Sequence, residues 1–359
     1  MARRRAVRRL SYLTLVLAVF GMLPTVQARV KSLGVVVEAV GLDVPRPFAP
    51  QIARVEISLD GVTGDLYYPG ERAPAIVLIP GAVEGGRDDP RVVRSARAIA
   101  RAERAVFVPD LELADRRFVE EDIDRIVRAA DALGSHPLVE EEVSILGFSF
   151  GGSFALIAAA DPRLDGRLAQ VAVFGAYFDL VGMIQAVTTR VSLVDGRRIP
   201  WEPHPLAAEI LEDVALRLVP PPGRGALVAS LAGTGAPEEL PPALRSVYDL
   251  LRNDDPEQTR ELASRLPPEA IATLERFSPS TVAADVSAPV NAMHSIDDPA
   301  VPYGEALRLI DALPGTRLTT VSLFRHVDFE PRSPGDWTRA AGDLWSAWLF
   351  AGRLLAAQE

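Results

Sequence analysis

The stretch Gly147-Phe148-Ser149-Phe150-Gly151-Gly152 lies between two apolar segments of different character. Residues 143–148 form a short run typical of a buried strand, and residues 150–160 read as a buried helix. A serine at a tight strand-to-helix turn needs a strained backbone, and glycines flank it because side chains there would collide with neighbouring elements. The pattern therefore predicts a serine hydroxyl held above a sheet edge, at a helix N-terminus. A glycine-rich turn with an ordinary solvated serine is the alternative interpretation.

Strands and helices alternate along the chain on both sides of this turn. The first two expected strands alternate apolar and polar residues, whereas the later ones are continuous apolar runs, as strands covered on both faces are. We expect strands over 55–59, 64–68, 75–79, 105–108, 143–148 and 171–174, and helices over 91–102, 119–133 and 150–160. This alternation predicts an α/β fold, with a mostly parallel sheet flanked by crossover helices.

The alternation stops for about a hundred residues after Phe178. Pro-rich breaks there separate short amphipathic stretches, near 205–218, 241–252, 256–265 and 268–276. Strand character returns at 290–293 and 318–323, before a final helix over 337–355. We therefore expect a sheet domain of residues 29–180 and 281–359, interrupted by a helical cap of residues 181–280. Such a cap is expected to set the substrate preference, with Trp201 and Tyr248 as candidate contacts.

An activated serine needs a base, and the chain has 4 histidines. His326 is the favoured base, because it follows the last expected strand in a short loop, at the same sheet edge as Ser149. His136 precedes the serine strand and is expected at the opposite edge. His204 belongs to the insertion and has no fixed relation to the strands. His294 ends a strand near the site and is expected to be held by packing.

The base in turn needs a carboxylate to fix its tautomer and stabilise the imidazolium. Asp298 is the favoured acid, because it follows the strand over 290–293 directly and heads the sequence Asp-x-x-Val-Pro. Its neighbour Asp297 is expected to shape the loop or cap a helix. Asp179 stays open as an alternative, since it follows the preceding strand and could also reach the imidazole.

Negative charge on a tetrahedral intermediate must be met by preorganised donors. The strand over 75–79 runs into the glycine-containing loop of residues 80–86, which is expected beside the serine. The backbone N–H groups of Ala82 and Phe150 are therefore the predicted oxyanion hole. This prediction depends on topology rather than on residue type, and a plain connecting loop is the alternative.

The order Ser149, Asp298, His326, with the turn after the fifth principal strand, resembles the α/β-hydrolase superfamily over roughly residues 53–355. The esterase and dienelactone-hydrolase branches are more similar than the peptidases. The resemblance implies the α/β-hydrolase fold with an inserted helical cap, and cleavage of carboxylic esters through an acyl-enzyme on Ser149. Two departures stand out: Pro80-Gly81 replaces the His-Gly of many relatives, and Ser149 replaces the cysteine of typical dienelactone hydrolases. An acyltransferase with the same triad and a non-catalytic binding protein of this fold remain alternatives.

Composition excludes several classes of function. The net charge is −10, and it becomes more acidic still once the first 28 residues, with five Arg and no acid, are set apart. Such a surface repels phosphate backbones, so no nucleic-acid partner is expected. The chain contains 0 Cys, and its acidic pairs lack spaced histidines. We therefore expect no metal, no cofactor and a small ester as the ligand.

The first 28 residues have the three regions of an export signal. An Arg cluster comes first, an apolar run over 10–23 follows, and small residues surround Ala28. The run is shorter than the roughly 20 residues that span a bilayer, which favours cleavage over a retained anchor. The protein is therefore expected to be periplasmic or secreted, with membrane contact only through this segment if it stays uncleaved.

Overall fold

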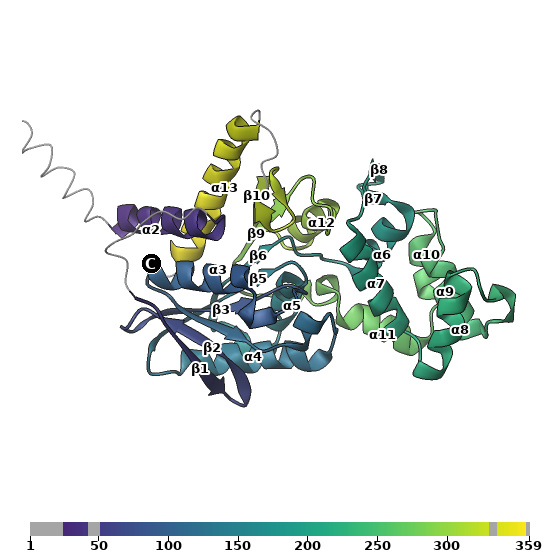
Figure 1. The fold of residues 1–359 in the computed structure, drawn as a ribbon, viewed down its shortest axis with the longest axis horizontal. Coiled ribbons are helices and arrows are strands. Elements are labelled where there is room, and N and C mark those ends of the chain that lie inside the picture. Colours follow the sequence, from purple (N-terminus) through teal and green to yellow (C-terminus); the bar gives the residue numbers. More distant parts are fainter. Residues whose placement is uncertain (1–23, 42–50, 330–335, 357–359) are drawn as a thin grey trace, which may run out of the picture.

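The structure is a computed structural model, and it describes residues 24–41, 51–329 and 336–356. An eight-stranded sheet runs through its centre in the order β1-β2-β4-β3-β5-β6-β9-β10 (Figure 1). Strand β2 pairs antiparallel with both of its neighbours, β1 and β4, and all other neighbouring strands of the sheet pair in parallel. The predicted mostly parallel sheet is therefore confirmed. The strands are β1 (Ala53–Leu59), β2 (Val62–Tyr68), β3 (Ala73–Ile79), β4 (Ala105–Pro109), β5 (Val139–Phe148), β6 (Leu168–Phe174), β9 (Val290–Ser295) and β10 (Arg317–Val321).

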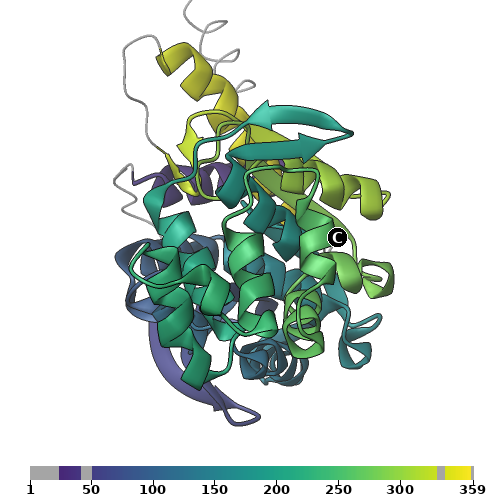
Figure 2. The ribbon, with the colours of Figure 1, turned by 90° about the vertical axis from the view of Figure 1, so that its right-hand side faces the viewer.

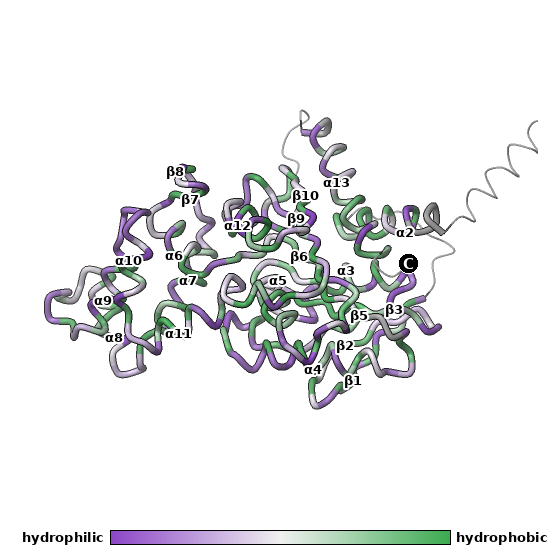
Figure 3. Tube along the Cα trace, turned by 180° about the vertical axis from the view of Figure 1, so that it is seen from behind, coloured by the Kyte–Doolittle hydropathy of each residue, from purple (hydrophilic) through white to green (hydrophobic). Residues whose placement is uncertain are grey.

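Helices cover both faces of the sheet. Alternate side chains of β3 enter two separate hydrophobic cores: Ile76 and Leu78 enter one, and Val77 and Ile79 enter the other. Figure 3 shows how hydrophobic residues gather along the central strands. The first core is covered by α2 (Pro24–Ala39), α3 (Pro90–Arg101) and α13 (Asp336–Ala356), and the second by α4 (Glu120–Gly134) and α5 (Phe150–Ala159).

Between β6 and β9 the chain forms a mainly helical segment. In Figure 2 its green helices face the viewer, in front of the sheet. It comprises α6 (Leu180–Thr189), the hairpin of β7 (Val191–Val194) and β8 (Arg197–Pro200), α7 (Pro205–Arg217), α8 (Pro221–Leu231), α9 (Pro242–Leu251), α10 (Thr259–Ser264) and α11 (Pro268–Arg276). Helix α8 was not predicted, because Pro221 and Pro222 indicated only a break. Proline suits the first turn of a helix, because the N–H that it lacks has no acceptor there.

Several further elements were not predicted. The hairpin β7–β8 interrupts the helical segment, α12 (Gly304–Ala312) lies between β9 and β10, and α2 precedes the sheet domain. The predicted export signal lies mostly outside the described residues, and only 24–28 of it fall in α2. Within the described ranges, every helix is too short or too polar to cross a bilayer.

Candidate active site

Ser149 occupies the turn between β5 and α5 with φ 53° and ψ −131°. This left-handed region is unusual for a residue with a side chain, and strain of this kind persists only where surrounding structure enforces it. Here the N–H of Ser149 donates to the carbonyl of Phe174, 2.8 Å away on the neighbouring strand β6. The serine is only 8% exposed. The sequence-predicted strand, turn and helix are therefore present, with the serine at the predicted point.

Glycines let three backbone segments meet at this turn. A Cβ on Gly151 would lie 2.2 Å from the carbonyl oxygen of Pro80, and one on Gly147 would lie 2.5 Å from that of Gly151. A Cβ on Gly81 would lie 2.9 Å from the Cβ of Ser149. The loop after β3 passes directly beside the serine, so none of these positions has room for a methyl group.

Helix α5 is fixed behind the serine by aromatic packing and hydrogen bonds. The ring of Phe150 lies 5.3 Å from that of Phe118 and 5.2 Å from that of Tyr177. The hydroxyl of Ser153 donates to the Tyr177 carbonyl at 2.7 Å, and the Tyr177 hydroxyl donates to the Phe277 carbonyl at 2.7 Å. Burial raises the pKa of Tyr177, so this hydroxyl stays a donor. These contacts hold the N-terminus of α5 in one position.

Asp298 and His326 form a directly bonded pair. Nδ1 of His326 lies 2.8 Å from Oδ2 of Asp298, and since a carboxylate can only accept, Nδ1 carries the proton. The other oxygen, Oδ1, accepts the N–H groups of Ala300 at 2.8 Å and Val301 at 3.0 Å. Asp298 is 1% exposed. Its hydrogen bonds fix the carboxylate, which in turn orients the imidazole and leaves Nε2 without its proton.

The backbone places His326 in the turn between two short strands, β11 (Phe324–Arg325) and β12 (Asp328–Phe329). Its φ of 62° is left-handed, like that of Ser149. Gly175 follows β6 with φ 66°, and a Cβ there would lie 3.0 Å from His326 Nδ1. The imidazole therefore packs against the end of the strand next to the one that carries the serine.

Electrostatics favour a charged acid and a neutral second histidine. Burial alone would raise the pKa of Asp298, but the charge and hydrogen bond of His326, with help from His294, lower it below its ordinary value. Burial lowers the pKa of His294, outweighing the attraction of Asp298 at 3.7 Å. Nε2 of His294 donates to the carbonyl of Val301 at 2.9 Å. His294 is therefore held by packing and hydrogen bonding, as expected.

One pocket of about 930 Å³ has both Ser149 and His326 in its lining, together with Ala82 and Phe150. Among the contacts of the described residues, no hydrogen bond joins the Ser149 hydroxyl to the imidazole. Such contacts are often long without substrate and shorten in the complex. The N–H groups of Ala82 and Phe150 likewise make no hydrogen bond within the described part of the chain. Two donors at the pocket wall are thus available to an oxygen bound there.

The other acids lie away from the imidazole. Asp179 caps α6 by accepting the N–H of Gly182 at 2.8 Å, and its other oxygen pairs with Arg260 at 3.1 Å. Asp297 is exposed beside the buried Asp298. The structure therefore places Asp298, rather than Asp179 or Asp297, against His326.

His204 and Trp201 differ from their predicted positions. The expectation that His204 has no fixed relation to the strands is wrong: its N–H donates to the carbonyl of Pro299 at 2.6 Å, and it lines the pocket. Trp201, a candidate substrate contact, donates from Nε1 to the carbonyl of Asp298 at 2.7 Å and is not among the residues that line the pocket. No spacing rule links residues a hundred positions apart, so sequence analysis could not find these two contacts.

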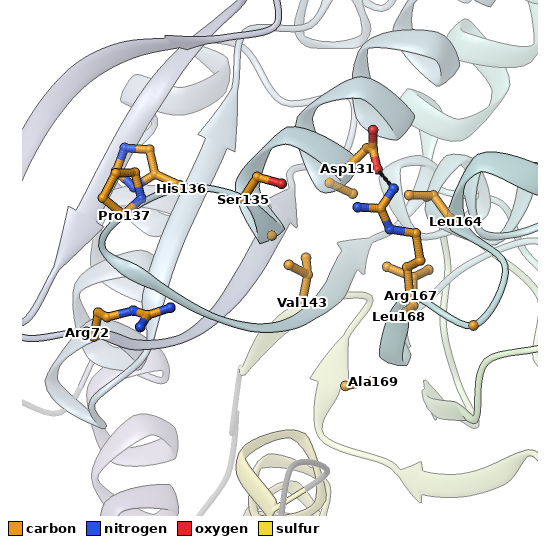
Figure 4. Close-up of a pocket in the computed structure, with 13 residues that line it drawn as sticks. Arg72, Asp131, Ser135, His136, Pro137, Val143, Leu164, Arg167, Leu168 and Ala169 are labelled. Carbon is orange, nitrogen blue, oxygen red and sulfur yellow. Dashed lines mark ion pairs between the residues drawn. The ribbon is translucent and has the colours of Figure 1, made fainter.

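A second pocket, of about 910 Å³, lies at the opposite edge of the sheet, before β5 and β6 (Figure 4). It contains His136, as the sequence predicted for that edge. Its cations already have partners, because Arg167 pairs with Asp131 and Arg72 donates to the Val139 carbonyl at 3.0 Å. The described lining includes Ser135 and His136, but no carboxylate bonds to this histidine, whose Nδ1 accepts the N–H of Leu138. Across the described ranges, no group of three or more acidic, His or Cys side chains could hold a metal ion.

No protein-family model and no curated protein matches the chain, whereas many solved structures do. The α/β hydrolase GrgF from Penicillium sp. sh18 is 17% identical, with 85% of this chain and 99% of that chain covered and a TM-score of 0.49. The dienelactone hydrolase from Anabaena variabilis is 19% identical, with 84% and 97% covered and a TM-score of 0.43. Est1E from Butyrivibrio proteoclasticus is 13% identical, with 81% and 96% covered and a TM-score of 0.44.

At these identities and TM-scores the comparisons carry no activity or substrate to this chain. The strand order, the serine turn between β5 and α5, and the positions of Asp298 after β9 and His326 after β10 agree with the expected architecture. The chain has the α/β-hydrolase fold.

Proposed function

We propose that this protein hydrolyses carboxylic esters through an acyl-enzyme on Ser149. The observation that carries the proposal is the 2.8 Å contact between His326 and the buried Asp298, at the wall of the pocket that contains Ser149. A hydroxyl, a histidine oriented by an acid, and free backbone donors in one pocket are the groups that acyl transfer needs.

In the proposed mechanism, Nε2 of His326 takes the hydroxyl proton of Ser149 while Oγ of Ser149 attacks the ester carbonyl carbon. The carbonyl oxygen becomes an oxyanion, which accepts hydrogen bonds from Ala82 and Phe150. His326 then protonates the leaving alcohol, and the C–O bond breaks. Water, deprotonated by His326, then attacks the acyl carbon. The bond between this carbon and Oγ of Ser149 breaks, His326 returns the proton to Oγ, and the acid is released. Asp298 stabilises the imidazolium in both halves of the reaction.

Replacement of the nucleophile tests this proposal. We expect Ser149→Ala to lower kcat for p-nitrophenyl butyrate by roughly 10⁴-fold or more, and to abolish labelling by a fluorophosphonate. Ser135→Ala, at an exposed serine in the second pocket, is the matched control and should keep both properties. Full turnover by Ser149→Ala would show that Ser149 is not the nucleophile.

We also propose that the protein acts after export. The Arg cluster and the apolar run over 10–23 support this, together with the small residues around Ala28. Cleavage after Ala28 would leave the pocket-lining residues of α2, Val35 and Val36, in the mature chain. N-terminal sequencing of the exported protein should begin at Arg29. A chain that stays cytoplasmic would contradict the proposal.

A further inference from the structure

The lining of the pocket at Ser149 extends well beyond the reacting groups, to residues of α2, α3 and α13. Figure 1 shows these three helices on one side of the sheet. The sheet side of this extension is apolar, with Phe174 from β6 and Met293 from β9. On the helix side, α2 contributes Val36 and α13 contributes Phe350. Helix α3 contributes Val92 together with the polar Arg91, Arg94 and Ser95. All lining residues from α2 and α13 are apolar.

A packing defect does not account for the volume of this pocket. Protein interiors are about as dense as organic crystals and contain few voids larger than a water molecule. The lining is mainly apolar with a smaller polar part, which is typical of a ligand-binding cleft. The whole pocket, at about 930 Å³, has the size of a small-molecule site, for which roughly 300–1,000 Å³ is usual.

We propose that this extension binds the acyl chain of the substrate, and that the chain is a linear aliphatic one of medium to long length. The inference rests on the proposed function. The acyl part stays attached to Ser149 after the first step, so it can occupy a hollow covered by α2. The alcohol must leave to solvent, and His204, which also lines the pocket, is exposed.

A series of p-nitrophenyl esters from acetate to dodecanoate tests the inference with the full-length protein. Each methylene that enters the extension should raise kcat/KM roughly fourfold, until the extension is full. Rates that stay level or fall beyond butyrate would overturn the acyl-chain site, while the assignment of Ser149 as nucleophile would stand.

Two substitutions on α2 distinguish an effect on the pocket from a general effect on the helix. Val36 is 6% exposed and lines the extension, whereas Leu33 is 51% exposed and does not. Val36→Trp should lower the ratio of kcat/KM for decanoate to that for acetate by roughly tenfold or more. Leu33→Trp should keep the wild-type ratio. Equal ratios in the two variants would overturn the proposal.

Ala351 on α13 gives an independent and milder obstruction, in case Val36→Trp does not fold. It is 5% exposed and also lines the extension. Ala351→Leu should shift the optimum of the ester series to a shorter chain. An unchanged optimum in a folded variant, as judged by its thermal melt, would contradict the placement of the chain.

Binding without turnover distinguishes this inference from the proposed function. Decanoate, below its critical micelle concentration, should bind the Ser149→Ala protein in a calorimetric titration. Adding Val36→Trp should weaken that binding roughly tenfold, and adding Leu33→Trp should not. Decanoate binding in a protein that cleaves no ester would refute the hydrolase but keep the site. Ester cleavage without decanoate binding would refute the site alone.

Discussion

Both carboxylate oxygens of Asp298 and its backbone carbonyl accept hydrogen bonds. One carboxylate oxygen holds His326, the other accepts two backbone N–H groups, and the backbone carbonyl accepts the indole of Trp201. A carboxylate held in this way needs no reorganisation when the imidazole becomes charged, which is the condition for strong electrostatic stabilisation. Because its pKa is lowered, the acid stays ionised over the range in which the imidazole works.

Replacing Asp298 and Asp179 in turn should show which of the two carboxylates supports His326. We expect Asp298→Asn to lower kcat by roughly 10³–10⁴-fold, because an amide no longer fixes the reactive tautomer of His326. Asp179→Asn should leave kcat within about twofold, since an Asn can still cap α6. Ester hydrolysis rates of the two purified variants provide the comparison. The reverse order of effects would make Asp179 the acid.

His294 should make stability depend on pH. Burial lowers its pKa, so below the ordinary value of 6.5 the unfolded chain binds a proton that the folded protein does not. The free energy of unfolding should therefore fall as the pH drops from 6.5, by at most about 1.4 kcal/mol per pH unit from this group. Urea titrations between pH 5 and 7 would measure this slope.

The control is a His294→Gln variant, in which this contribution to the slope should disappear even if overall stability is lower. The other titratable groups are the same in both proteins, so the difference between the slopes reports the loss of His294 together with its effect on the pKa of Asp298. An equal slope in the two proteins would mean that His294 does not titrate as its burial requires.

At the scale of elements, the sequence was most informative where local pattern and topology coincide. The turn at Ser149 has a sequence signature, because its glycines are sterically required. The rule that carboxyl ends of parallel strands share one edge then brought Asp298 and His326 to the same side. Helix α2 has no such signature, since its sequence follows directly on the apolar export-like run. Its position depends on contacts with α3 and α13, which no local pattern encodes.

The connection between β8 and α7 is held on the acid loop by two hydrogen bonds. Trp201 donates to the carbonyl of Asp298, and the N–H of His204 donates to that of Pro299. Trp201 is therefore expected to position the acid rather than to contact substrate. A neutral hydrogen bond contributes about 1 kcal/mol, which corresponds to roughly fivefold in rate if the transition state feels all of it.

We therefore expect Trp201→Phe to lower kcat roughly fivefold, with little change in KM. The phenyl ring keeps most of the packing but cannot donate to Asp298. Trp345→Phe is the matched control, because this indole is 57% exposed on α13 and should not affect turnover. An increase in KM alone would instead point to a substrate contact by Trp201.

On the scale of the whole molecule, two separate layers complete the pocket. Helices α2, α3 and α13 line it on one side of the sheet edge, and the segment between β6 and β9 contributes His204, Ala207 and Ile210. The remaining helices of that segment, α8 to α11, contribute no residue to the lining. We therefore expect different parts of the chain to set the preference for the acyl group and for the alcohol group of the ester. The start of α7 should set the preference for the alcohol group.

Neighbouring residues of α7 allow this division to be tested. Ile210 is 4% exposed and lines the pocket, whereas Leu211 is 3% exposed and does not. Either residue replaced by Ala should cost about 2–5 kcal/mol of stability, so the pair is matched for destabilisation. Only Ile210→Ala enlarges the space for the leaving alcohol, and it should raise kcat/KM for benzyl butyrate relative to ethyl butyrate roughly fivefold. The acyl-length profile should stay unchanged in both variants. A change in alcohol preference shared by Leu211→Ala would show that loosening of the segment, rather than space beside Ile210, sets that preference.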